Sequence, residues 1–278
     1  MLYAWCRYCD DQIDSQHLGF AIERDPAPPR SRLEQLERET RRTLAGEPVE
    51  HPAFVALRRV VERHGIPHRY PLELLQGFAM DVEQRRYDEL EDTLMYCYHV
   101  AGVVGVMMAY VMGVKDSDTL VRAADLGIAF QLTNIARDVM DDAHLGRTYL
   151  PSKWLAEAGV PPAEIMLAER RPAVFKVVKR LLDEAERYYD SAAEGLPQLG
   201  WRAAWGIATA RIVYRDIGRI VIKRGPAAWD ERAVVGRGRK VYGAMRGLLR
   251  AASAVSVGRQ LPAKQRTALW TKSIQSDD

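Results

Sequence analysis

Three aspartates near the start of the chain form the first cluster of residues that could do chemistry. Asp10, Asp11 and Asp14 follow a D-D-x-x-D pattern inside residues 3–16, whose apolar positions indicate a helix. Residues four apart share a helix face, so Asp10 and Asp14 point the same way and repel each other unless a cation lies between them. A solvated acidic turn explains this pattern equally well, although apolar neighbours such as Trp5 indicate a helix packed into a core.

A second stripe of polar residues lies far along the chain. Gln131, Asn134, Asp138 and Asp142 are spaced three, four and four residues apart on a predicted helix, and Arg137 lies beside them. This spacing places four oxygen-bearing side chains on one helix face. Two helices that each carry such a stripe predict a site for hard divalent cations, whereas either stripe alone would be a weak signal.

The chemistry of such a site follows from the ligands it offers. Mg²⁺ binds one or two carboxylates, keeps waters and shares the rest of its shell with phosphate oxygens, while arginines hold the same phosphates. Together they neutralise a diphosphate as its carbon–oxygen bond breaks. The remaining allylic carbocation needs a dry pocket and gains from aromatic faces. The available aromatic residues are Tyr3, Trp5, Tyr96, Tyr98, Phe130 and Tyr214, although an aromatic in a helical core more often packs than reacts.

The elements that must position these residues are helices almost throughout. Apolar residues recur at three- and four-residue spacing, and Gly- and Pro-rich breakers separate the segments. These segments are residues 32–45, 53–64, 72–82, 120–141, 173–193, 203–223 and 241–257. No strand ladder is predicted, and a polar tail from about Gln260 is expected to fray. The pattern indicates one all-α domain over residues 1–258 and a polar tail over 259–278.

Residues 94–114 form an apolar stretch without Asp, Glu, Lys or Arg that is long enough to span a bilayer. Polar interruptions, and the absence of a basic cluster after it, favour the buried central helix of a large α domain over a membrane anchor. On this helix Ala101, Gly105, Met108 and Met112 share one face. The small residues indicate close approach of either a neighbouring helix or a bound ligand, and the sequence leaves both explanations open.

Composition bounds the classes of function. The 278 residues are 47% hydrophobic and 28% charged, as in an ordinary soluble globular protein. The net charge of +3 gives no argument for nucleic acid as a partner. Three cysteines do not make a disulfide framework and are consistent with a reducing cytoplasm. Nothing in the sequence indicates the oligomeric state.

Several motifs together resemble the squalene/phytoene synthase family. They are YAWCRYCDDQID at 3–14, QGFAMD at 76–81, YCYHVAGVVG at 96–105 and QLTNIARD at 131–138. Two further motifs, DDAHLGRTYLP at 141–151 and AAWDER at 227–232, resemble the bacterial phytoene synthase branch of the family. The resemblance covers about residues 1–250, and several long motifs match together.

The resemblance implies an all-α isoprenoid synthase fold, a single helical domain around a central cavity. It also implies a prenyl transferase of carotenoid biosynthesis, which condenses two geranylgeranyl diphosphates head to head to phytoene through a cyclopropyl diphosphate. Mg²⁺ or Mn²⁺ is the implied cofactor, and NADPH is not expected. The implied metal ligands are Asp10, Asp14, Asn134, Asp138 and Asp142, and Asp10, Asp14, Asp138 and Arg137 are the implied catalytic residues. The expected substrate contacts are Tyr3, Arg7, Gln131, Arg137 and Tyr214, together with the pocket candidates Tyr96, Ala101 and Gly105.

Two departures and two alternatives accompany this interpretation. Family members carry a helix before residues 3–14, with a serine-rich stretch that contacts a diphosphate; here the first helix begins without an N-cap, so an upstream helix of about thirty residues is expected. Gln76 stands where the family often has Glu. One alternative is a squalene or dehydrosqualene synthase acting on farnesyl diphosphate, and the other is a non-catalytic protein anchored in the membrane by residues 94–114. Because substrate and product are lipids, the expected location is the cytoplasm, with transient contact at the inner face of the membrane.

Overall fold

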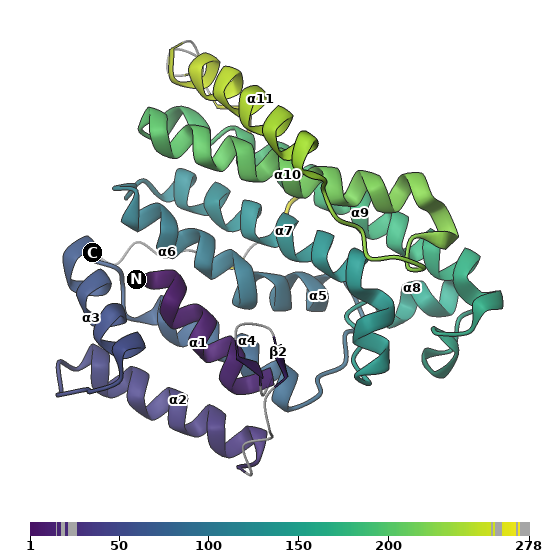
Figure 1. The fold of residues 1–278 in the computed structure, drawn as a ribbon, viewed down its shortest axis with the longest axis horizontal. Coiled ribbons are helices and arrows are strands. Elements are labelled where there is room, and N and C mark those ends of the chain that lie inside the picture. The colour runs from purple at the N-terminus through teal and green to yellow at the C-terminus, as the bar shows by residue number, and fades with distance from the viewer. Residues whose placement is uncertain are drawn as a thin grey trace.

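The computed structural model is a bundle of α-helices (Figure 1). It describes residues 1–14, 16–17, 20–21, 27–256, 258, 263–270 and 272, and all structural statements concern these residues. The helices are α1 Leu2–Asp14, α2 Pro29–Leu44, α3 Pro52–His64, α4 Arg69–Val82, α5 Leu90–Cys97, α6 Val103–Val111, α7 Ser117–His144, α8 Ser152–Glu157, α9 Arg171–Ala193, α10 Trp201–Arg224 and α11 Arg237–Ser256. The predicted all-α class is confirmed, with one small unpredicted addition: strands β1 Gln16–His17 and β2 Phe20–Ala21 pair antiparallel after α1.

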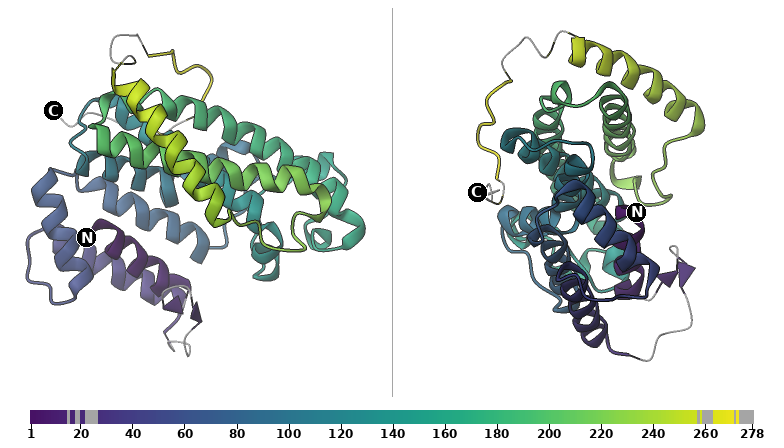
Figure 2. Two further views of the ribbon diagram at one scale, coloured as in Figure 1. Left: turned by 45° about the horizontal axis from the view of Figure 1, so that its top comes forward. Right: turned by 90° about the vertical axis from the view of Figure 1, so that its left-hand side faces the viewer.

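Helix α7 forms the centre of the bundle. It packs against α6 on one side and against α9 and α10 on the other, while α1 to α4 form a neighbouring group and α11 covers α10 from outside (Figures 1 and 2). The sequence of α7 explains its position, because Ile128, Ala129 and Leu132 are fully buried on one side. The polar stripe from Gln131 to Asp142 occupies another side of the same helix, so the core holds this stripe in place.

The predicted central helix spans α5, the π-helical turn η1 (Tyr98–Gly102) and α6. The segment Leu90–Val111 has the length and hydropathy of a membrane span, and 56% of the tested window is buried inside the bundle. Much of its remaining apolar surface, including Val104 and Met108, lines an internal cavity. These placements support the central-helix interpretation. A π-turn inserts one extra residue into a helix and is often found at a functional site.

Two helices begin at a proline, three residues before the predicted start at residue 32 and one residue before the predicted start at residue 53. Helix α2 begins at Pro29, and α3 begins at Pro52. Proline is well tolerated in the first helical turn, because the backbone N–H that it lacks has no partner within the helix there. Helix α11 begins four residues before the predicted start at residue 241, because its first turn is basic and lacks the apolar spacing used to find it.

The expectation of a frayed polar tail is wrong for residues 263–270 and for Lys272, which lie against the bundle. Arg266 donates two hydrogen bonds, of 2.9 and 2.8 Å, to the fully buried carboxylate of Asp125 on α7. The Tyr188 hydroxyl donates to the Trp270 carbonyl at 2.9 Å, and Lys272 pairs with Glu73 at 3.1 Å. Polarity was misleading here, because the polar residues of this segment satisfy polar groups buried in the bundle.

Replacing Arg266 with methionine is expected to lower the free energy of unfolding by about 2 kcal/mol, because the buried Asp125 carboxylate loses two charge-assisted hydrogen bonds. Urea unfolding followed by circular dichroism measures this change. Lys179→Met is the control, since Lys179 and Asp183 form an exposed pair whose loss should cost less than about 0.5 kcal/mol. Equal destabilisation by both changes would show that the C-terminal segment is not held by Arg266.

Candidate active site

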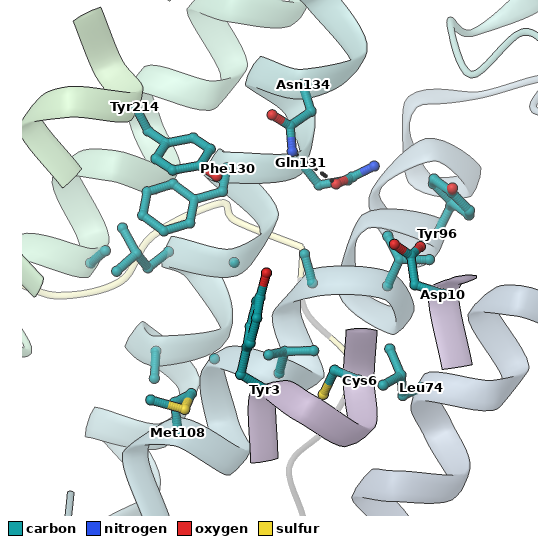
Figure 3. Close-up of a pocket in the computed structure, with 18 of the residues that line it drawn as sticks. Tyr3, Cys6, Asp10, Leu74, Tyr96, Met108, Phe130, Gln131, Asn134 and Tyr214 are labelled. Atoms are coloured by element: carbon teal, nitrogen blue, oxygen red, sulfur yellow. Dashed lines mark hydrogen bonds between the residues drawn. The ribbon is translucent and has the colours of Figure 1, made fainter. Parts of the chain in front are cut away.

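A cavity of about 620 Å³ lies among α1, α4, α6, α7 and α10. This volume falls within the ordinary range for small-molecule sites. Polar side chains gather toward one part of the cavity, where Asp10, Gln131 and Asn134 lie, and Met108 lies well away from them (Figure 3). The cavity therefore offers a polar end joined to an apolar pocket, as an amphiphilic substrate requires.

The polar end has two facing walls. Asp10 comes from α1 on one wall, and Gln131, Asn134, Asp138 and Asp142 come from α7 on the other (Figure 3). The Asn134 side-chain amide donates to the Gln131 side-chain carbonyl at 3.3 Å. The structure thus brings together the two stripes predicted from spacing, with more than a hundred residues between them. The backbone of Asp14 ends α1, but its side chain lies outside the described part of the structure, so its predicted role as a ligand stays a prediction.

Arg7 lies between two of the aspartates on α1. Its guanidinium pairs with Asp10 at 2.8 Å and with Asp11 at 2.8 Å. Asp10 and Arg7 line the cavity, whereas Asp11 is buried beside them. Arg7 thus supplies a positive charge for the crowded carboxylates of this helix, and it is also in a position to contact an anion in the cavity.

Two arginines hold Asp138. Arg137 donates from Nε to Asp138 Oδ1 at 2.7 Å and makes a second, shorter contact to Oδ2. Arg232 approaches the same carboxylate at 3.3 Å from the segment that follows α10. The hydrogen bond to Asp138 raises the pKa of Arg137. Arg137 was expected to contact substrate; the structure places it beside the cavity, where it orients Asp138.

The carboxylates of the polar end fit a divalent cation. Burial, and then the nearby charge of Asp138, raises the pKa of Asp142 to about 7, because ionising it adds a negative charge to a crowded, desolvated site. A bound cation would relieve this repulsion. Within the described residues no three His, Cys, Asp or Glu side chains converge closely enough to hold an ion by themselves. Mg²⁺ takes few protein ligands and completes its shell with water and phosphate oxygens.

Two tyrosines surround Asp81, and all three residues line the polar end of the cavity. The Tyr96 hydroxyl donates to Asp81 Oδ2 at 3.1 Å, and the Tyr149 hydroxyl donates to Oδ1 at 2.7 Å. The two rings stack with centroids 4.5 Å apart. Burial, and then the charge of Asp81, raises the pKa of both hydroxyls, so they stay protonated and keep donating.

Several residues of the cavity wall were not assigned a role from the sequence. Asp81, Arg147 and Tyr149 line the cavity, and Arg232 reaches Asp138. A signal was present, because all four lie inside the motifs at 76–81, 141–151 and 227–232. Their role was missed because none of these motifs has the helical spacing that marks a ligand stripe.

The apolar part of the cavity contains the helix face predicted from residues 94–114. Ala101, Gly105, Met108 and Met112 all line it. From Ala101 to Met112 the wall extends about 16 Å at 1.5 Å per helical residue. Gly105, however, contributes only backbone, since its missing side chain would point at α7, where an added Cβ would lie 2.3 Å from the Ala123 carbonyl oxygen.

The aromatic residues divide into lining and core. Phe130 and Tyr214 stack with ring centroids 4.1 Å apart, and Tyr3 lines the cavity while 75% exposed. Tyr96 also lines it. Trp5 and Tyr98 are buried in the core and are not part of the cavity wall, so they do not supply the aromatic faces considered from the sequence.

Comparison with known proteins places this geometry in a family. The sequence profile described as "Squalene/phytoene synthase" matches residues 1–239. The chain belongs to the squalene/phytoene synthase family. The family assignment made from the motifs is therefore confirmed.

Two relatives and a solved structure show how far the similarity extends. A "15-cis-phytoene synthase" from Pantoea ananas is 55% identical over 234 residues, which cover 84% of this chain and 75% of the relative. Another, from Paracoccus sp. (strain N81106 / MBIC 01143), is 48% identical over 274 residues, covering 98% and 87%. A crystal structure of a dehydrosqualene synthase in complex with ligand superposes with a TM-score of 0.80 at 28% identity, covering 91% of this chain and 85% of that one. The isoprenoid synthase fold of the family is therefore confirmed.

Proposed function

We propose that this protein is a prenyl transferase that condenses two geranylgeranyl diphosphates head to head to phytoene, a step of carotenoid biosynthesis. The observation that carries the proposal is a long apolar pocket joined to facing stripes of oxygen ligands, in a chain 48–55% identical to phytoene synthases. The pocket suits the prenyl chains, and the polar end suits their diphosphates.

The polar end would hold the diphosphates through cations and arginines. Asp10 on α1, with Asn134, Asp138 and Asp142 on α7, would bind Mg²⁺ or Mn²⁺, which when bound neutralises diphosphate charge as the leaving group departs. Arg7 and Arg147 line the same end and are placed to donate hydrogen bonds to phosphate oxygens. Arg137 and Arg232 keep the Asp138 carboxylate oriented.

The proposed reaction needs a pocket that holds two prenyl chains close together and keeps water away from the carbocation. The carbon–oxygen bond of one substrate breaks, and its diphosphate leaves. A double bond of the second substrate attacks the allylic cation, and loss of a proton closes a cyclopropyl diphosphate. This intermediate loses the second diphosphate, rearranges and loses a second proton to give phytoene, so the overall reaction needs no reductant. The faces of Phe130 and Tyr214 are placed to stabilise positive charge on carbon.

Incubation with geranylgeranyl diphosphate and Mg²⁺, without NADPH, tests the proposal, and phytoene is the expected product. Excess EDTA should abolish product formation, and added Mg²⁺ or Mn²⁺ should restore it. Without a cation, the negative aspartates and the negative diphosphate repel each other. Farnesyl diphosphate offered in parallel, with and without NADPH, distinguishes a squalene or dehydrosqualene synthase. Full activity in the chelator, or exclusive use of the fifteen-carbon substrate, would overturn the proposal.

The apolar end should set the longest chain accepted. Replacing Met108 with tryptophan adds bulk to the wall far from the carboxylates, so we expect turnover of the twenty-carbon diphosphate to fall at least about tenfold relative to that of the fifteen-carbon one, the range that pocket contacts of a few methylenes give. Met108→Leu is the matched control, because it nearly conserves volume and should leave the ratio unchanged. Competition between the two substrates measures the ratio, and an unchanged ratio in the tryptophan variant would place the chain terminus elsewhere.

We also propose that the protein works in the cytoplasm in transient contact with the inner face of the membrane. Support comes from the chemistry of the proposed reaction, since geranylgeranyl diphosphate is amphiphilic and phytoene is a hydrocarbon with negligible solubility in water.

A further inference from the structure

Helix α11 presents a row of large apolar side chains to solvent. Val241, Tyr242, Met245, Leu248 and Leu249 are 44–71% exposed. Their spacing of one, three, three and one residues places them on a single face of the helix. Exposed apolar residues scattered singly are ordinary, but a contiguous row on one helix marks a surface that another apolar phase covers.

The opposite face of α11 explains why this row is not turned inward. Gly243, Gly247 and Ala251 are buried against α10. An added Cβ at Gly247 would lie 2.4 Å from the Thr209 hydroxyl oxygen, so the two helices approach closely through small residues. The helix is therefore held on α10 by its small residues, and its large apolar residues are left exposed. Figure 2 shows α11 lying along the outside of α10.

Basic residues accompany the exposed apolar row. Helix α11 carries Arg237, Arg239, Lys240, Arg246 and Arg250 and has no acidic residue. All five side chains are exposed, and none is ion-paired with any residue that the structure describes. An apolar helix face with cations beside it and no anions matches the surface of an anionic bilayer, where apolar side chains enter the interface and cations meet lipid phosphates.

Two tryptophans extend this surface toward the apolar end of the cavity. Trp201 and Trp205, on the first turns of α10, are 54% and 38% exposed and stack with centroids 6.3 Å apart. The Trp205 indole donates to the Ala244 carbonyl of α11 at 2.9 Å, so this ring is attached to α11. Leu199 and Ile207, which flank the pair in the sequence, line the cavity. The outer surface and the apolar cavity therefore share one short stretch of chain.

We propose that the exposed face of α11, together with Trp201 and Trp205, docks the protein on an anionic lipid bilayer beside the apolar end of its cavity. The proposal rests on the proposed function for its purpose, since a lipid product must pass from the cavity into a membrane. A second copy of this chain is a poorer occupant, because a two-fold contact would set one set of five cations against another.

Sedimentation with vesicles tests the docking surface without any substrate. The full chain is expected to bind vesicles containing phosphatidylglycerol, to bind neutral phosphatidylcholine vesicles more weakly, and to lose binding as salt rises. Met245→Glu/Leu249→Glu, which places charges in the apolar row, should weaken binding at least about tenfold. Arg239→Glu/Arg246→Glu should weaken binding to the anionic vesicles alone by a similar factor.

Matched controls separate docking from general effects of charge or folding. Arg59→Glu/Arg63→Glu on α3 removes two exposed cations elsewhere, and Met166→Glu adds a charge at another exposed apolar residue; both should bind like the parent. All variants should keep the parent melting temperature and the parent turnover of detergent-dispersed substrate, because the changed side chains are exposed and outside the cavity. If the two α11 variants unfold, a fluorescence measurement on the parent chain replaces them. Vesicles should then protect the fluorescence of Trp201 and Trp205 from an aqueous quencher.

Three results would overturn the docking proposal. They are no binding of the parent to either kind of vesicle, equal loss of binding in the control variants, and light scattering that shows a dimer broken by the α11 changes, which would assign this face to a second copy. Because vesicle binding and product formation are measured separately, a chain that binds vesicles but makes no phytoene would contradict only the proposed reaction. A chain that makes phytoene but ignores vesicles would contradict only the docking surface.

Discussion

Asp138→Asn is expected to lower turnover of geranylgeranyl diphosphate at least about 100-fold with the helical fold intact, a loss typical of removing one charged group that stabilises a leaving group. The side chain keeps its size and one oxygen but loses the negative charge that would attract Mg²⁺. Asp138 is also the point where Arg137 and Arg232 meet, so the change additionally loosens a pair of cations beside the diphosphate site. Much of the loss should appear as a higher Mg²⁺ requirement.

The matched control for this prediction is Asp141→Asn. Asp141 precedes Asp142 on the same helix but is exposed and does not line the cavity. It should retain turnover within about twofold, since the Asp141 carboxylate is solvent-exposed and its effect on the neighbouring Asp142 is weakened by water and salt. Steady-state rates measured across a Mg²⁺ titration decide the matter. Comparable rates in the two variants would remove Asp138 from the metal site, and a collapsed far-ultraviolet spectrum of Asp138→Asn would assign the loss to folding.

Local spacing predicted the parts of the site that lie on one helix. The stripe from Gln131 to Asp142 was found because helical geometry alone decides which side chains share a face, and α7 keeps that geometry over its whole length. The same argument found the wall from Ala101 to Met112, despite the π-turn that begins before it. The helical class was equally accessible, since apolar spacing of three and four residues recurs along most of the chain.

Contacts between distant segments were not accessible in that way. Arg232 reaches Asp138 across 94 residues, and Tyr149 reaches Asp81 across 68. Arg232 and Tyr149 both lie inside motifs that resemble the family, but a lone Arg or Tyr in a connecting segment has no periodicity that could assign it a partner. The prediction of a frayed tail was wrong for the same reason. Arg266 appeared as one polar residue among many, and its partner Asp125 lies 141 residues away in the core. Only the fold brings such pairs together.

Gly105 is the position at which the structure decides between two explanations that the sequence left open. The packing explanation required a neighbouring helix against the glycine, and the ligand explanation required a prenyl chain there. An added Cβ would lie 2.3 Å from the oxygen and 3.0 Å from the carbon of the Ala123 carbonyl. These are backbone atoms of α7, the central helix, and they cannot move aside as a flexible side chain could. The approach is reciprocal, since an added Cβ at Gly127 on α7 would lie 2.2 Å from the Ala101 carbonyl oxygen.

Gly105→Leu is therefore expected to destabilise the protein by about 3 kcal/mol or more, at or beyond the upper end of ordinary overpacking, because it separates two helices of the core. Turnover of the twenty-carbon and fifteen-carbon diphosphates should fall together, in contrast to the selective loss expected for Met108→Trp. Gly206→Ala is the control: it also adds a Cβ to a helical glycine, but in open space, so it should stabilise by up to about 1 kcal/mol. Thermal unfolding and competition between the two substrates measure both effects. An unchanged melting temperature with selective loss of the longer substrate would instead place the prenyl chain against Gly105.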